Sequence, residues 1–195
     1  AVAEGEIVAK HFWEKGFQVF VLTYTTAVFE NIVLRKMPLK DITKAVRMIR
    51  LHSEEWKVSP EKITAVGFSA GGHLVSSLSA HYDDPELKGK DEFADISARP
   101  DAVILSYPVI TTGEYMHKGS IEALYGANIS PEEADYADPC KHVNSQTPPA
   151  FIWTTVNDQE VPLENSLLYA KALKAGNVPF ALHIFSDGEH GSSIA

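Results

Sequence analysis

The sequence predicts an α/β fold with a mostly parallel sheet flanked by helices. Short apolar runs rich in β-branched and aromatic residues alternate with amphipathic helical patterns along the 195 residues. Near-continuous apolar runs are typical of strands buried on both faces, and the alternation indicates βαβ units. This length suits one compact domain. We therefore expect one domain over residues 1–195, with residues 111–149 as an insertion over the active-site end of the sheet.

The expected strands share a length of six to ten residues and few charges. In chain order they are 17–24 (FQVFVLTY), 62–68 (KITAVGF), 101–110 (DAVILSYPVI), 150–156 (AFIWTTV) and 180–185 (FALHIF).

Helical patterns occupy the stretches between these runs. Residues 1–16 suggest a first helix. In the stretch after Pro38, apolar residues recur mostly at steps of three and four, which predicts one buried helix face; they are Leu39, Ile42, Val46, Ile49 and Trp56. A third helix is expected between Pro162 and Gly176, because proline favours helix starts and glycine follows helix ends. The 39 residues of 111–149 are too long for a plain connection, so we expect short helices there.

Composition narrows the classes of function. The net charge of −9, from 17 Lys and Arg against 26 Asp and Glu, argues against nucleic acid as a partner. No apolar run reaches the ~18 residues of a membrane span. Cys140 is the one cysteine, so no internal disulfide can form, and a reducing, cytoplasmic location is expected. The sequence is compatible with a leader upstream of residue 1 and with a homo-oligomer.

The motif with the strongest chemical meaning is Gly-Phe-Ser-Ala-Gly at 67–71. In this G-x-S-x-G pattern a serine lies on a sharp strand-to-helix turn, where strand and helix backbones approach closely and glycines give room. We expect Ser69 to be the nucleophile and the Ala70 N–H, at the helix start, to stabilise an oxyanion. The alternative is a glycine-rich turn with an incidental serine.

A serine nucleophile needs a base and an acid, which follow it in the order Ser, acid, His in such folds. Asp158 comes first after the 150–156 run, and His190 lies in a glycine-flanked loop after the 180–185 run. Both would lie at the carboxyl ends of strands, where active sites of open α/β sheets gather. Glu160 is the main rival acid, with Asp187 and Glu189 nearby.

The other histidines have less specific roles. His183 alternates inside a strand, which favours a core position, and His73 on the helix after Ser69 favours packing. Tyr115 and His117 in the insertion are candidates for contact with substrate. Metal-binding spacing such as H-E-x-x-H is absent from the sequence, and we expect neither a metal nor a cofactor.

Five stretches in order together resemble the α/β-hydrolase superfamily, and more narrowly the bacterial esterases and lipases of the acetyl-esterase, acetylxylan-esterase-like group. They are KHFWEKGFQVFVLTY, ITAVGFSAGGHL, RPDAVILSYPVI, TPPAFIWTTVNDQEVPLENSLLYAKAL and VPFALHIFSDGEHGSSIA. The resemblance implies Ser69 as nucleophile, Asp158 as acid, His190 as base and Ala70 as one oxyanion donor. It also implies a second donor from a glycine-rich loop upstream of residue 17, where the glycines are Gly5 and Gly16.

The expected function is a serine ester hydrolase for short acyl esters, such as an acetylated carbohydrate. The alternatives are a serine peptidase on the same fold and a non-catalytic hydrolase-like protein. Because the resemblance places earlier strands and a closing helix outside the sequence, we expect the fold to be incomplete at both ends.

Overall fold

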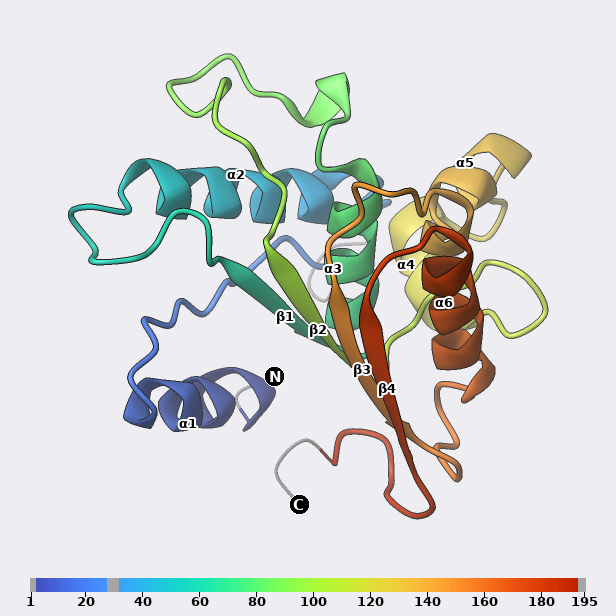
Figure 1. Cartoon of the computed structure of the whole chain (residues 1–195). Helices are drawn as coiled ribbons and strands as arrows, with labels where there is room; N and C mark the ends of the chain where they lie inside the picture. The colour runs from blue at the N-terminus through green and yellow to red at the C-terminus, as the bar shows by residue number, and fades with distance from the viewer. Residues whose placement is uncertain (1–2, 28–31, 193–195) are drawn as a thin grey trace.

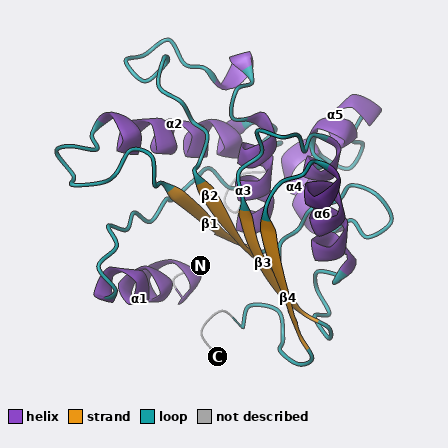
Figure 2. Cartoon of the chain, viewed as in Figure 1, coloured by secondary structure: helices purple, strands orange, loops and turns teal. Residues whose placement is uncertain are grey.

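A parallel sheet organises the molecule, as the sequence predicts (Figures 1 and 2). The computed structural model describes residues 3–27 and 32–192, so the first two residues of the expected N-terminal helix lie outside it. In the described residues the sheet has four strands in the order β1–β2–β3–β4, all parallel. They are β1 (Thr64–Phe68), β2 (Ala102–Ser106), β3 (Ala150–Thr155) and β4 (Phe180–Phe185).

One face of this sheet is buried under helices. In the register, Gly67 lies beside Leu105, Leu105 beside Ile152, and Ile152 beside Leu182. Leu105 and Ile152 are fully buried. The helix α3 (Ala70–His81) packs on β1 and β2, and α6 (Glu164–Ala175) packs on β3 and β4. The core therefore lies between this face and the helices.

The helix α2 (Met37–Leu51) extends the same layer by packing on α3 (Figure 1). Pro38 lies in its first turn, and Leu39, Ile42 and Val46 are buried, as the periodicity predicts. Trp56 was expected on this face but lies in the turns after the helix, which ends at Leu51.

Residues 111–149 hold short helices, as expected. They are α4 (Lys118–Tyr125), α5 (Pro131–Tyr136) and the 3-10 turn η3 (Pro139–Lys141). Ser130 and Glu133 form a reciprocal cap at the start of α5, which satisfies backbone N–H groups that the helix leaves free. Another 3-10 turn, η2 (Pro85–Leu87), follows α3.

The expected strand at 17–24 is wrong. These residues follow a π-helical turn, η1 (Ala3–Ile7), and α1 (Val8–Glu14), and they run as extended chain outside the sheet. Their apolar composition favours a strand, but a strand also needs a neighbour to share its backbone hydrogen bonds. None of the described strands lies beside this segment, and Phe17 and Val21 are more than half exposed.

The second face of the sheet corrects the expectation of strands buried on both sides. Val66 and Phe151 lie on this face, in register through Ile104, and are 37% and 41% exposed. His183 lies on the same face and is exposed, so its expected core position is wrong. Its ring lies 5.0 Å from that of Phe151. His183 is exposed because β4 lies at the edge of the sheet and the helices α3 and α6 cover the opposite face.

Candidate active site

Ser69 lies on the sharp turn between β1 and α3. Its φ of 52° and ψ of −119° are a conformation that L side chains seldom adopt. Backbone hydrogen bonds hold it there: the Ser69 N–H donates to the Ser106 oxygen at 3.0 Å, and the Ser69 oxygen accepts from Val109 and His73 N–H groups, each at 3.1 Å. The strained turn is thus fixed from β2, from the segment after it and from α3.

The glycines around the serine differ in what they permit. A Cβ on Gly67 would lie 2.2 Å from the Gly71 oxygen, and one on Gly72 would lie 2.7 Å from the Pro108 Cβ. A Cβ on Gly71 would meet only the Tyr24 hydroxyl, at 3.9 Å. Tight packing therefore needs glycine at 67, as expected, and at 72, whereas the expected steric demand at 71 is wrong.

His190 connects the serine to an acid. Its Nε2 lies 2.8 Å from the Ser69 Oγ, and its Nδ1 lies 2.7 Å from the Asp158 Oδ2. The structure thus brings together the three residues proposed from the sequence, from turns that follow β1, β3 and β4. The Asp158 side chain is 1% exposed and that of His190 is 22% exposed, so the imidazole connects a shielded carboxylate to the hydroxyl of the half-buried Ser69.

Backbone N–H groups orient the carboxylate. The Asp158 Oδ1 accepts from the Glu160 and Val161 N–H groups, both at 2.9 Å, which leaves Oδ2 directed at His190. The loop of His190 is anchored on β3, because the Thr155 hydroxyl donates to the Gly188 oxygen at 2.7 Å. Hydrogen bonds of this kind fix the imidazole orientation on which proton transfer depends.

The rival acids are placed elsewhere. The exposed Glu160 contributes its backbone N–H to Asp158, and the Asp187 carboxylate accepts from the Asn157 amide at 2.6 Å. Glu189 is exposed. His73 is buried, as expected for a packing role, with its Nε2 2.8 Å from the Ala137 oxygen. The geometry therefore favours Asp158 over each rival.

Tyr107 adjoins the site and gave no signal in the sequence. It follows β2 with a φ of 37°, and its ring centroid lies 4.9 Å from that of His190 in an edge-on arrangement. Its hydroxyl donates to the Glu4 carboxylate at 2.6 Å. The first turn of the described chain therefore reaches Tyr107, whose ring lies beside the His190 imidazole.

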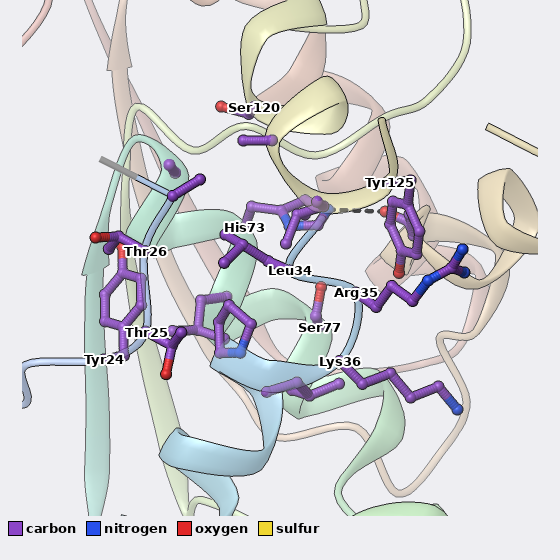
Figure 3. Close-up of a pocket in the computed structure, with 18 of the residues that line it drawn as sticks. Tyr24, Thr25, Thr26, Leu34, Arg35, Lys36, His73, Ser77, Ser120 and Tyr125 are labelled. Atoms are coloured by element: carbon purple, nitrogen blue, oxygen red, sulfur yellow. Dashed lines mark hydrogen bonds between the residues drawn. The ribbon is translucent and has the colours of Figure 1, made fainter. Parts of the chain in front are cut away.

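The candidate oxyanion donor Ala70 is the first residue of α3, where backbone N–H groups lack an intrahelical acceptor. Ala70 and His117 both line a cavity of about 450 Å³. Figure 3 shows other residues that line this cavity, His73 among them. Tyr115 is absent from that lining, and its backbone oxygen accepts from the Asn165 amide at 2.9 Å. His117 also caps α4, since its Nδ1 accepts from the Ser120 N–H. The two candidate substrate residues thus have different surroundings.

The described residues, 3–27 and 32–192, hold no cluster of three or more His, Cys, Asp or Glu side chains suited to a metal ion. None of the helices found there combines the length and the apolar character needed to cross a bilayer.

An α/β-hydrolase fold is defined by the parallel sheet, the strand-to-helix turn that carries the serine, and the Ser–His–Asp contacts. Similarity to known proteins supports this assignment. An endo-1,4-beta-xylanase B of Butyrivibrio fibrisolvens is 47% identical over 98% of this chain and 30% of its own length. An acetylxylan esterase of Xylanibacter ruminicola is 29% identical over 91% of this chain and 35% of its own. The chain thus spans about a third of these relatives.

The crystal structure of an acetyl ester-xyloside bifunctional hydrolase from Caldicellulosiruptor lactoaceticus superposes with a TM-score of 0.90. It is 41% identical over 98% of this chain and 69% of that one. The family model BD-FAE matches residues 3–173. The chain belongs to the BD-FAE family, within the esterase group of α/β-hydrolases.

Proposed function

We propose that the protein is a serine carboxylic-ester hydrolase that acts on short acyl esters, such as acetyl groups on carbohydrate. The observation that carries this proposal is the continuous hydrogen-bonded series Asp158–His190–Ser69, with contacts of 2.7 and 2.8 Å. The printed names of the relatives, an acetylxylan esterase and an acetyl ester-xyloside hydrolase, support the ester and carbohydrate parts.

The mechanism follows from the roles of the three side chains. His190 Nε2 takes the proton of the Ser69 hydroxyl while Oγ bonds to the acyl carbon. The oxyanion that forms is stabilised by the Ala70 N–H. Asp158 holds the imidazole tautomer and stabilises the imidazolium. His190 then gives the proton to the departing alcohol oxygen. Water, deprotonated by the same nitrogen, cleaves the acyl-serine and restores the hydroxyl.

No step of this scheme needs a metal or an organic cofactor. The Ser69 φ of 52° suits a nucleophile presented to solvent at the end of a strand. The substrate is a small molecule or a carbohydrate ester.

We further propose that residues 111–149 shape specificity, because loops over strand ends commonly do so and His117 lies on the cavity beside Ala70. Tyr115 has the weaker case, since it does not line that cavity.

The test compares p-nitrophenyl esters with amino-acid anilides, with a fluorophosphonate as an irreversible label. We expect turnover of the esters and one label on Ser69, located by peptide mass. Cleavage of anilides with greater kcat/KM than esters would instead identify a serine peptidase. Absence of both turnover and label would identify a non-catalytic relative. Ser69→Ala is the control that should lose label and turnover together.

For the insertion, His117→Ala and Tyr115→Phe are compared across acetylated sugars and p-nitrophenyl acetate. A changed ratio of the two substrates in the His117 variant supports the proposed role, and flat ratios in both variants contradict it.

A further inference from the structure

Tyr107 adopts a backbone conformation that its residue type does not favour. It directly follows β2 with a φ of 37°, in the left-handed region where L side chains are strained. Glycine would adopt this φ without that strain. Strained residues gather at functional sites, where the surrounding structure holds them. The conformation therefore points to a role for the Tyr107 side chain.

The backbone around Tyr107 is fixed to the nucleophile turn. The Ser106 oxygen accepts from the Ser69 N–H at 3.0 Å, and the Val109 N–H donates to the Ser69 oxygen at 3.1 Å. Tyr107 itself donates its N–H to the Trp153 oxygen on β3 at 2.7 Å. The segment after β2 is thus held both by the serine turn and by the neighbouring strand, and these bonds set where the Tyr107 ring lies.

The Tyr107 ring is also held by its own contacts. Tyr107 is 2% exposed, and its ring centroid lies 5.0 Å from that of Trp153 and 6.2 Å from that of Phe68. Trp153 and Phe68 belong to β3 and β1, the two strands that flank β2. The hydroxyl donates to Glu4 Oε1 at 2.6 Å. Because each contact limits rotation of the ring, the ring is a rigid support for its neighbour.

That neighbour is the imidazole of His190, which has few contacts of its own. His190 lies between two exposed residues of the loop after β4. Its ring nitrogens contact Asp158 Oδ2 at 2.7 Å and Ser69 Oγ at 2.8 Å. Contacts at these two nitrogens do not oppose a tilt of the ring about the line that joins them. The Tyr107 centroid lies 4.9 Å from that of His190 at an interplanar angle of 65°, an edge-to-face pair that opposes this tilt.

The reaction removes one of the two nitrogen contacts. In the acyl-enzyme the Ser69 Oγ is bonded to the acyl carbon and has no proton to donate, so its hydrogen bond to His190 is lost. The imidazole must then receive a water molecule at Nε2 and take its proton. A displacement of about 1 Å can cost roughly 10²-fold in rate. The contact with the Tyr107 ring involves no proton and persists through this step.

We propose that Tyr107 is a positioning residue, whose ring holds the His190 imidazole in place while water cleaves the acyl-enzyme. The proposal rests on the proposed esterase function and assigns a further residue to its second half-reaction. The role belongs to the ring, and the hydrogen bond between the hydroxyl and Glu4 serves to fix that ring.

The experiment is stopped-flow kinetics of the full-length protein with p-nitrophenyl acetate, with functional sites counted by complete fluorophosphonate labelling. Acylation releases p-nitrophenol, and the steady rate that follows reports deacylation once deacylation is the slower step. Tyr107→Leu removes the ring. We expect it to lower the rate constant of deacylation by about 10- to 100-fold and that of acylation by a smaller factor. A burst of p-nitrophenol equal to the labelled sites should then precede the steady rate.

Three further variants separate the ring from other effects. Tyr107→Phe restores the ring and should keep kcat within about tenfold of the wild-type value. Tyr107→Asn also lacks the ring, but asparagine tolerates a positive φ better than leucine, so this variant keeps the test valid where the leucine variant fails to fold. Val103→Ala is the matched control, since Val103 lies on β2, is 1% exposed and belongs to the core. It should keep both rate constants per labelled site.

The outcomes distinguish the two proposals. Deacylation within about threefold of the wild-type rate in both ringless variants would overturn the positioning role alone. An equal loss in Tyr107→Phe or in Val103→Ala would do the same, as would acylation slowed more than deacylation. Failure of the wild-type protein to cleave the ester or to take the fluorophosphonate would overturn the esterase function itself, and the role of Tyr107 with it.

Discussion

Two regions of the molecule approach Ser69, and they are held in place by different means. The turns after β1, β3 and β4 carry Ser69, Asp158 and His190 on strands that share backbone ladders. The segment 3–27 reaches the same site from outside the sheet. It is attached through side chains, as where Glu4 accepts from Tyr107 and Asp41 accepts from the Thr25 N–H and hydroxyl, both at 2.7 Å.

The difference shows what fixes a catalytic group. A side chain at the end of a paired strand inherits its position from many backbone hydrogen bonds, so the loss of one contact leaves it in place. A segment held by single side-chain contacts depends on each of them. We therefore expect substitutions in the sheet turns to affect chemistry and substitutions in the segment 3–27 to affect stability.

The largest effect is expected where the turns after β1 and β4 meet. Ser69→Ala and His190→Ala should each lower kcat by on the order of 10⁶ with a much smaller change in KM, because the triad acts as a unit. Steady-state kinetics on p-nitrophenyl acetate and the unfolding midpoint are the measurements. A loss of only tenfold for either variant would show that the 2.8 Å contact is not the catalytic one.

A smaller loss is expected at the acid. Asp158→Asn should lower kcat by roughly 10⁴, because the amide no longer stabilises the imidazolium. Glu160→Gln is the matched control, since it keeps the backbone N–H that orients Asp158. Unchanged turnover in the Asp158 variant together with collapse in the Glu160 variant would reverse the assignment.

Tyr107 links the two regions, so its substitution tests their coupling. Tyr107→Phe keeps the ring against His190 but leaves Glu4 without this donor. We expect the free energy of unfolding to fall by about 1.5–3 kcal/mol, the range for a hydrogen bond to a charged group. We expect kcat to fall less than tenfold. Denaturant unfolding of the single variants Tyr107→Phe and Glu4→Gln and of their double variant measures the coupling; additive losses would mean that the contact is not formed.

The smallest effect is expected at the exposed apolar residues of 17–24. Val21→Thr should change the free energy of unfolding by less than about 0.5 kcal/mol, because Val21 is 54% exposed and outside the sheet. Leu105→Ala in β2 is the contrast and should cost about 2–5 kcal/mol. A comparable loss at Val21 would indicate that this segment is packed in solution.

The sequence predicts most of the sheet because apolar runs, helix faces and the order of motifs are local signals. The runs at 62–68, 101–110, 150–156 and 180–185 contain the four strands. The run at 17–24 looks the same locally, but its pairing depends on a neighbour that no short pattern specifies. The exposure of His183 likewise follows from which face the helices cover.

The same distinction holds for the site, where local sequence patterns predict some residues and the tertiary fold alone places the others. The strand ends and turn residues point to Ser69, Asp158 and His190, because function gathers where parallel strands end. Tyr107 and Glu4 are separated by 103 positions, and only the folded topology brings them together. The cavity wall also escapes prediction, since it joins α3 and α4 to the chain before α2.

The glycines of the serine turn have a consequence for how this sequence can vary. Alanine at 71 would meet only a hydroxyl at van der Waals distance, whereas alanine at 67 or 72 would overlap the backbone or Pro108. In a library randomised over these codons and selected for ester cleavage, position 71 should accept alanine and serine. Positions 67 and 72 should return glycine. Glycine would thus be retained at 67 and 72, five positions apart, instead of at 67 and 71 as in the G-x-S-x-G pentapeptide.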